Sequence, residues 1–161
     1  MQVRCDSLLF SDLDSLARLY KKPVVWNEGN RQYSADSLFV LIRGNKADRA
    51  SLMSNAFITV QEDSTHFDQI KSPDVMAYFN DDSSLRRFDA LGGASALFYL
   101  QENETVATVN KVECKMFSAM LEDGSLDNIV YFDSPKNDAY PVVQMPEKDQ
   151  RMKGFDWQPG R

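Results

Sequence analysis

The residues of this sequence that could do chemistry are one histidine, two cysteines and a recurring aspartate. His66 lies in the polar stretch Asp63-Ser64-Thr65-His66, where a single histidine is most often a surface residue. No serine or cysteine has the sequence context of an activated nucleophile. These residue types therefore offer no candidate for nucleophilic catalysis.

The recurring aspartates are Asp6, Asp36 and Asp74, which occupy similar positions in successive repeats. A column of carboxylates on a β fold could supply the acid and base of a glycosidase or lyase. Such a pair is needed only once, however, whereas an aspartate that recurs at the edge of a turn is more often an Asx-turn or a cap. We predict that the protein is not an enzyme. A polysaccharide-acting enzyme would require two carboxylates that converge in a cleft.

The two cysteines, Cys5 and Cys114, occupy the place where other repeats carry Ala35 and Pro73. A small, buried position explains all four residues. The first and fourth units of a linear stack are not neighbours, so a disulfide is not expected between them. Without a CxxC pair or a histidine cluster, we predict two free thiols, no metal site and no cofactor.

The composition indicates one folded domain, because 43% of the residues are hydrophobic and 11% are aromatic. The formal charge is −6 and no basic run interrupts the mixture, so the footprint of a nucleic-acid partner is missing. No stretch approaches the ~18 consecutive apolar residues of a membrane span. The strand pattern begins without a signal-peptide core. The alternatives are a cytoplasmic protein and a piece of a longer exported one, and we favour the second because the repeat pattern begins at once.

One β-rich unit occurs four times along the chain. It is clearest at residues 35–42 with a return over 45–60, and related stretches begin at residues 5, 73 and 114. Equivalent positions are separated by 30, 38 and 41 residues, a period typical of stacked repeat units. Each unit consists of a strand, an acidic or glycine turn, a strand, a kink and a strand. The sequence predicts an all-β fold of stacked strand pairs.

The stretch from Leu13 to Tyr20 is the one ambiguous segment of the first unit. Leucines at 13, 16 and 19 have helical spacing. Against a helix, Pro23 follows closely and the corresponding stretches of the other units are β-like. We predict a strand preceded by a turn over residues 12–15.

A glycine pair, Gly92-Gly93, divides the run Leu85–Tyr99. Without a following lysine and helix it is no phosphate loop, and it favours a bulge or a tight corner. The run resembles the strand, Gly-Gly-Ala, strand repeat of the OstA-like family of periplasmic lipopolysaccharide-transport proteins. The stretches Leu19–Trp26, Ala139–Pro141 and Gly154–Trp157 extend this resemblance, over about residues 3 to 157, toward OstA-like proteins of Bacteroidetes-type bacteria.

The resemblance implies an open β-jelly-roll, a solenoid-like folded sheet similar to LptA-like proteins. It implies a periplasmic protein, with association with the outer membrane left open, that transports lipopolysaccharide by enclosing its acyl chains in an apolar groove. The implied partners are the lipid A acyl chains and other Lpt-type β modules, or a second copy stacked end to end. The alternative is a structural or adhesive β-solenoid that binds no lipid. The first requires an apolar groove open to solvent, and the second a fully packed interior.

Two apolar columns are the candidate lining of such a groove. A strand period of two places residues of one column on the same face. The same columns could equally form a packed core. If they line a groove, each buried CH₂ of an acyl chain contributes about 0.8 kcal/mol. The candidate lipid-binding residues are Leu8, Phe10, Leu38, Val40, Met76, Tyr78 and Phe117. The other face, with Leu9, Phe39, Val75, Ala77 and Ser118, is expected to point outward.

The C-terminal end differs from the repeats. We predict a repeat domain over residues 1–143 and a polar, proline-containing tail over 144–161. Phe155 and Trp157 alternate around Asp156 and could dock on the same chain or on a neighbouring module. We favour docking on the same chain.

Overall fold

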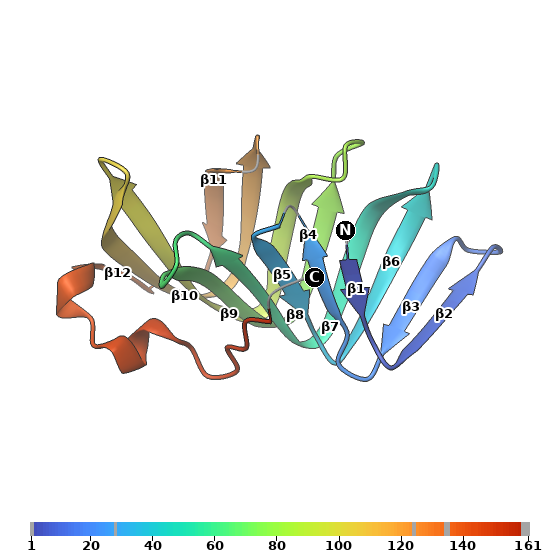
Figure 1. The fold of residues 1–161 in the computed structure, drawn as a ribbon, viewed down its shortest axis with the longest axis horizontal. Coiled ribbons are helices and arrows are strands. Elements are labelled where there is room, and N and C mark those ends of the chain that lie inside the picture. The colour runs from blue at the N-terminus through green and yellow to red at the C-terminus, as the bar shows by residue number, and fades with distance from the viewer. Residues whose placement is uncertain (1, 28, 124, 134–135, 159–161) are drawn as a thin grey trace.

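The computed structural model describes residues 2–27, 29–123, 125–133 and 136–158. Over these ranges, twelve antiparallel strands form a single sheet, and two 3-10 helices lie in the C-terminal tail (Figure 1). The strands are β1 (Gln2–Arg4), β2 (Ser7–Ser11), β3 (Leu16–Tyr20), β4 (Val24–Asn27), β5 (Arg31–Ser34), β6 (Ser37–Arg43), β7 (Lys46–Gln61), β8 (Phe67–Phe79), β9 (Leu85–Glu102), β10 (Thr105–Glu122), β11 (Ser125–Phe132) and β12 (Lys136–Pro141). The helices are η1 (Val142–Gln144) and η2 (Glu147–Gln150).

The sheet is folded on itself into two layers that share the long strands β7 to β10. The first half of β7 pairs with β6, and its second half pairs with β5. Strand β10 likewise pairs with β12 through its first half and with β11 through its second. We call the layer that contains β1, β4, β5 and β12 layer A, and the layer that contains β2, β3, β6 and β11 layer B. The predicted all-β folded sheet is confirmed.

The long strands change layer at a common line, which we call the corner. On β7 the corner residues Ser54 and Asn55 have φ of 67° and 54°, and on β9 Gly92 and Gly93 have φ of 89° and 104°. Glycine suits the second site because a Cβ on Gly92 would lie 3.3 Å from the Cγ of Pro73 on β8. The glycine pair thus makes the corner that the sequence predicted.

Two of the recurring aspartates hold this corner. The Asn55 side chain donates a 2.9 Å hydrogen bond to a carboxylate oxygen of Asp36, whose backbone N–H donates to the Ser54 carbonyl at 2.8 Å. The backbone N–H of Ser54 donates to the carboxylate of Asp74 at 3.1 Å. Both carboxylates therefore bind the bend of β7, which is the structural use expected of a residue that recurs at a turn edge.

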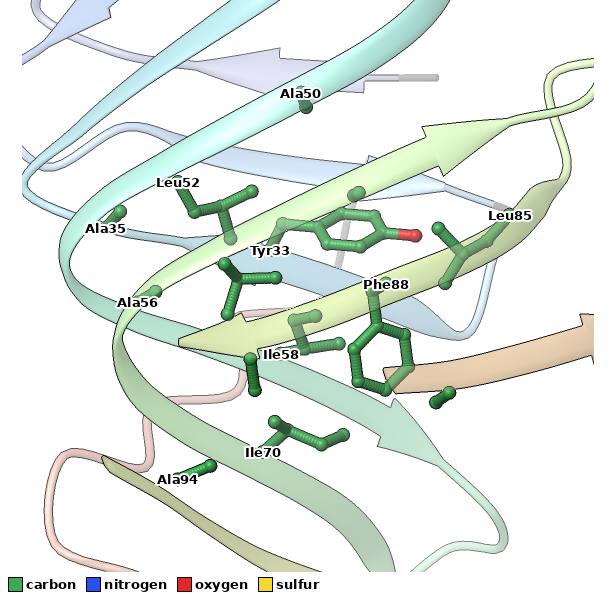
Figure 2. Packing of buried hydrophobic residues seen from close by; sticks show 14 of the residues in the cluster. Tyr33, Ala35, Ala50, Leu52, Ala56, Ile58, Ile70, Leu85, Phe88 and Ala94 are labelled. Atoms are coloured by element: carbon green, nitrogen blue, oxygen red, sulfur yellow. The ribbon is translucent and has the colours of Figure 1, made fainter. Parts of the chain in front are cut away.

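The core fills the space between the layers. Layer B contributes Leu38, Leu52 and Val75, and layer A contributes Tyr33 and Ile58, all almost fully buried. Figure 2 shows Leu52, Tyr33 and Ile58 among the buried side chains. Aromatic rings cross between the layers, with centroids 6.2 Å apart for Tyr33 and Phe79 and 6.3 Å apart for Phe98 and Phe117. Burial of each large apolar side chain contributes about 1.5–3 kcal/mol, so the contact between the layers is the main stabilising element.

The predicted alignment of the third unit was wrong by one residue. Leu38 pairs with Leu52, which pairs with Val75 rather than Met76. The reason lies at the corner, where Pro73 alone stands opposite Ser54 and Asn55 on β7. Because strand side chains alternate between faces, this shift places Val75 and Ala77 inside. Met76 and Tyr78, predicted to face inward, belong to the outer face.

Two local predictions of the sequence are confirmed. The ambiguous segment forms β3 after a turn over residues 12–15. Cys5 and Cys114 are free cysteines at equivalent places along the corner, as predicted. The predicted burial was wrong, because both cysteines are only partly buried and Pro73, at the equivalent place, is exposed. Burial raises the pKa of the Cys114 thiol, which disfavours the reactive thiolate.

Candidate functional site

The interior between the layers is closely packed in the middle of the molecule. An internal space there amounts to about 10 Å³, roughly enough for one water molecule. It is lined by Val25, Tyr33, Leu38, Val40, Ala50, Leu52 and Phe79. An acyl chain could enter this region only if the layers separate.

The N-terminal end of the interior is open. Leu8 pairs with Leu19 and continues the buried column of Leu38, and Phe10 pairs with Ala17 and continues that of Val40. In contrast to those columns, Leu8 is 55% exposed and Phe10 is 52% exposed. The inner face therefore ends in solvent at β2, as an exposed apolar edge.

The C-terminal end carries a second exposed apolar edge. Ile129 and Tyr131 of β11 pair with Ala119 and Phe117 and pack, partly buried, against the core. Among the described strands, β11 and β12 each pair only with β10, and β1 and β2 each pair with a single strand at the opposite end. Each layer thus presents one unpaired strand edge at each end, and such edges are templates for pairing with another chain. The large apolar side chains exposed at the C-terminal edge are Leu126, Val130, Phe132 and Tyr140.

A hydrogen bond joins the layers on the side opposite the corner. The side-chain amide of Asn27, the last residue of β4, donates to the carbonyl of Ser83 at 3.0 Å. Ser83 lies in the turn between β8 and β9, so this bond connects the free end of layer A to that of layer B. Asn27 is buried. We call this contact the latch.

The tail crosses the outer face of layer A and is held there by buried glutamines. The Gln69 carboxamide donates to the carbonyl of Gln150 at 2.8 Å and accepts from the N–H of Met152 at 2.7 Å. Gln32, on β5, makes the same pair of hydrogen bonds: its carboxamide donates to the carbonyl of Asp156 at 2.7 Å and accepts from the N–H of Gln158 at 2.8 Å. Each carboxamide thus pairs with the tail backbone as a neighbouring strand would.

Aromatic contacts add to these hydrogen bonds. The Phe67 ring lies 5.2 Å from that of Phe155 and 5.3 Å from that of Trp157, and the Arg151 guanidinium lies over Phe67 and Phe155. Docking on the same chain, which the sequence favoured, is therefore observed. The boundary between 143 and 144 stays a prediction, and residues 159–161 of the tail lie outside the described residues.

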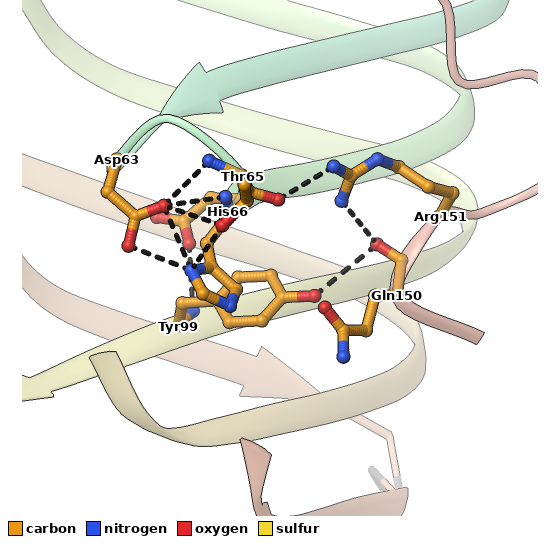
Figure 3. Close-up of polar contacts among 7 residues, drawn as sticks. Asp63, Thr65, His66, Tyr99, Gln150 and Arg151 are labelled. Carbon is orange, nitrogen blue, oxygen red and sulfur yellow. Dashed lines mark hydrogen bonds and ion pairs between the residues drawn. The ribbon is translucent and has the colours of Figure 1, made fainter. Parts of the chain in front are cut away.

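The single histidine takes part in a structural cluster at the turn between β7 and β8 (Figure 3). His66 Nδ1 lies 2.8 Å from a carboxylate oxygen of Asp63, and its ring centroid lies 5.1 Å from that of Tyr99. Burial disfavours ionised Asp63, yet hydrogen bonds from the His66 ring and from the N–H groups of Thr65 and His66 lower the pKa of Asp63 to about 2. Burial raises the pKa of Tyr99 to about 12. The Arg151 side chain donates to the Thr65 carbonyl at 2.7 Å, which ties the cluster to the tail.

Five of the seven predicted lining residues lie on the inner face. Through the intervening strand β3, Leu8 is aligned with Leu38 and Phe10 with Val40. Phe117 pairs with Ala90, which in turn pairs with the inward-facing Val75. The structure does not bring Met76 and Tyr78 to this face. The role of the seven residues in lipid binding stays a prediction.

Sequence reasoning missed Gln32 and Gln69. Gln32 lies between Arg31 and Tyr33, and Gln69 between Asp68 and Ile70, and each glutamine is buried in the fold. Because each alternates with an inward-facing apolar residue, the sequence pattern predicts a solvent-exposed outer position and carries no signal of the tail that covers it.

Comparisons with known proteins were made on both sequence and fold. No protein-family model matches the sequence, and no curated protein has significant similarity to it. A solved structure with a similar fold is LptH from Pseudomonas aeruginosa, described as the LptA homologous periplasmic component of the conserved lipopolysaccharide transport device. The match has a TM-score of 0.61 and 13% sequence identity, and covers 86% of this chain and 92% of that one. The fold predicted from the OstA-like resemblance is thereby confirmed. Neither 3-10 helix of the described chain is long and apolar enough to cross a membrane.

Proposed function

We propose that this protein binds lipopolysaccharide in the periplasm and passes it along a stack of β modules during outer-membrane assembly. The observation that carries the proposal is the folded sheet, which is similar to that of LptH. In this chain the two layers of the sheet have apolar faces that point toward each other. The LptH description names a transport component, which supports a binding role rather than catalysis.

Acyl chains enter, in this proposal, at the N-terminal end. Leu8 and Phe10 provide half-exposed apolar contacts in line with the buried columns. Each CH₂ removed from water there contributes about 0.8 kcal/mol, so several chains bind without any basic residue. Further entry requires the layers to separate past Leu38, Val40 and Phe117, and in the third unit past Val75 and Ala77 rather than Met76 and Tyr78.

The unpaired edges supply the contacts for stacking. Strands β1 and β2 at one end and β11 and β12 at the other leave backbone groups available to a second module. Joined end to end, two modules place the exposed inner face of β2 next to that of β11. The partner is a second copy of the chain or another Lpt-type β module.

A structural or adhesive module without lipid binding is the second candidate. The observation that favours it is the packed central interior, in which an internal space amounts to about 10 Å³. In that case the exposed apolar edge at β2 is merely an end of the sheet awaiting a neighbouring module.

The test compares two neighbouring leucines on opposite faces of β2. Leu8 points inward and Leu9 outward, and both are more than half exposed. Leu8→Asp should weaken lipopolysaccharide binding at least tenfold, because a charge then stands at the exposed apolar edge. Leu9→Asp, the matched control, should leave binding unchanged. Equal binding by both variants and the unsubstituted protein would favour the structural module.

A further inference from the structure

A groove of about 810 Å³ lies on the outer side of the corner, where the tail passes over layer A. Its floor includes the corner residues Ser72, Pro73 and Gly93, and tail residues from 148 to 153 form one wall. A second groove of about 710 Å³ adjoins it and shares Lys71 and Lys153. Both lie outside the space between the layers, so neither belongs to the proposed acyl-chain site.

Lysines from distant parts of the chain meet in the first groove. Lys71 of β8 and Lys111 of β10 come from layer A, and Lys148 and Lys153 come from the tail. The Lys71 ammonium donates to the carbonyl of Lys153 at 2.9 Å, which places its charge between sheet and tail. Within the described residues, none of these four lysines forms an ion pair. The adjoining groove adds Arg4, Lys21 and Lys22, together with the acidic Asp6 and Asp156.

The acidic residues of the first groove are fewer. Asp36, Glu113 and Asp149 line it, and the Asp36 carboxylate already accepts a hydrogen bond from Asn55. Arg151 also lines the groove, but its guanidinium is engaged with Phe67, Phe155 and the Thr65 carbonyl. The groove therefore carries an excess of positive charge on a chain whose formal charge is −6. A concave surface with one prevailing sign of charge concentrates ligands of the opposite sign.

We propose that this groove binds a ligand that carries two or more phosphoryl groups, and that its occupancy holds the tail against layer A. Lysine is a point-charge donor suited to phosphoryl oxygens. Lys71 and Lys111 contact the ligand from the sheet, and Lys148 and Lys153 from the tail. Because the site needs both parts, release of the tail abolishes binding, and binding in turn slows release of the tail.

Phosphoryl groups of this kind occur on small soluble anions and on the sugar headgroups of glycolipids. Titration calorimetry with inorganic pyrophosphate tests the first source, and micelles of diphosphorylated against dephosphorylated lipid A test the second. Saturable binding of pyrophosphate supports the site with a soluble anion as its ligand, and tighter binding of diphosphorylated than of dephosphorylated lipid A supports it with a glycolipid headgroup. Either effect should weaken as salt is raised. No binding of pyrophosphate, together with equal binding of the two forms of lipid A at low salt, would overturn the proposal.

Substitutions at the groove test which residues act. Lys71→Gln combined with Lys111→Gln should weaken binding about tenfold, as expected for the loss of two partly exposed charges. Glu113→Gln should strengthen it about twofold to fivefold, because a like charge is removed. Lys46→Gln, at the exposed first residue of β7 and away from the groove, is the matched control and should change nothing. An equal effect of Lys46→Gln would indicate only a response to net charge and would contradict the site.

The role of the tail is tested by substitution of its two groove lysines. Lys148→Gln and Lys153→Gln are exposed, so the fold should persist while binding falls about threefold to tenfold. In the unsubstituted protein, saturating ligand should slow hydrogen exchange of residues 150–156. Unchanged binding in the lysine variants, or unchanged exchange at saturation, would contradict a site shared by sheet and tail. Pyrophosphate has no acyl chain, and comparison of the two forms of lipid A cancels the contribution of their acyl chains, so the outcome is separate from that of lipid transport.

Discussion

The side-chain oxygen of Gln69 accepts a hydrogen bond from the backbone N–H of Met152 at 2.7 Å, while its amide group donates to the carbonyl of Gln150 at 2.8 Å. Gln69 is completely buried, at 0% exposed, so the tail is the partner that makes its burial possible. A polar side chain in the middle of a sheet thus binds a segment far along the chain.

Gln69→Leu should release the middle of the tail. The substitution leaves the N–H of Met152 without its partner, at a cost of about 1–3 kcal/mol if that group stays buried. It also removes one hydrogen bond from the carbonyl of Gln150, which keeps those from the Tyr99 hydroxyl and the Arg151 guanidinium. Hydrogen exchange at Met152 should become much faster. Gln101→Leu, at an exposed position of β9, is the control and should leave exchange at Met152 unchanged. Slow exchange in the Gln69 variant would show that aromatic contacts alone hold the tail.

The glycine pair at the corner should tolerate alanine unequally. Both residues have left-handed φ, so either substitution strains the backbone by about 1–3 kcal/mol. Gly92→Ala should cost more than Gly93→Ala, because its Cβ would lie 3.3 Å from Pro73 whereas a Cβ on Gly93 would meet nothing within 4 Å. Urea unfolding of the two variants gives the difference. An equal loss of stability would show that the Pro73 contact relaxes freely.

How much of this architecture could be predicted from sequence is clearest at the corner. Gly92-Gly93 indicated a corner, and alternating residues such as Leu38 and Val40 indicated an inner face, because both effects are local. The sequence could not show whether Met76 and Tyr78 point inward or outward. Their orientation depends on the bulge at the corner, where two residues of β7 lie opposite the single residue Pro73 of β8. The same limit applies to side chains that meet only in the folded chain.

The site depends more heavily on such long-range contacts. The predicted apolar columns were mostly correct, yet their packed centre and open end follow from how the two layers meet. The sequence could not predict that the groove lysines meet, because Lys71, Lys111 and Lys153 are far apart along the chain and form no basic run. Only the crossing of the tail over layer A gathers them.

The Asp63 carboxylate should stabilise the fold in a pH-dependent way. Folding lowers its pKa from the ordinary 3.8 to about 2, so its contribution is present above pH 4 and is lost as pH falls from about 3.8 toward about 2. Asp63 is 40% exposed, so we expect less than about 1 kcal/mol. Asp63→Asn should lower the urea midpoint at pH 7, and the gap should narrow near pH 2. Asp81→Asn, in an exposed turn, is the control, and a gap that persists at pH 2 would contradict the ionic origin.

The latch between the layers should limit entry to the interior. Asn27→Ala removes the 3.0 Å bond to the Ser83 carbonyl, with an expected loss of about 0.5–1.5 kcal/mol in unfolding free energy. If acyl chains enter by separation of the layers, this variant should bind lipopolysaccharide faster in stopped-flow measurements. Asn30→Ala is the control, because the Asn30 side chain bonds the Gln61 carbonyl within layer A at 3.5 Å. Equal association rates for both variants would indicate that the latch does not gate entry.

The most direct test of lipid binding is photo-crosslinking from β2. A benzoyl-phenylalanine at Phe10 faces the inner side, and one at Leu9 faces outward, with exposures of 52% and 59% in the unsubstituted protein. If the inner face receives acyl chains, the Phe10 position should crosslink to lipopolysaccharide and the Leu9 position should not. Equal labelling of both positions, or labelling of neither in folded protein, would contradict an acyl-chain site between the layers.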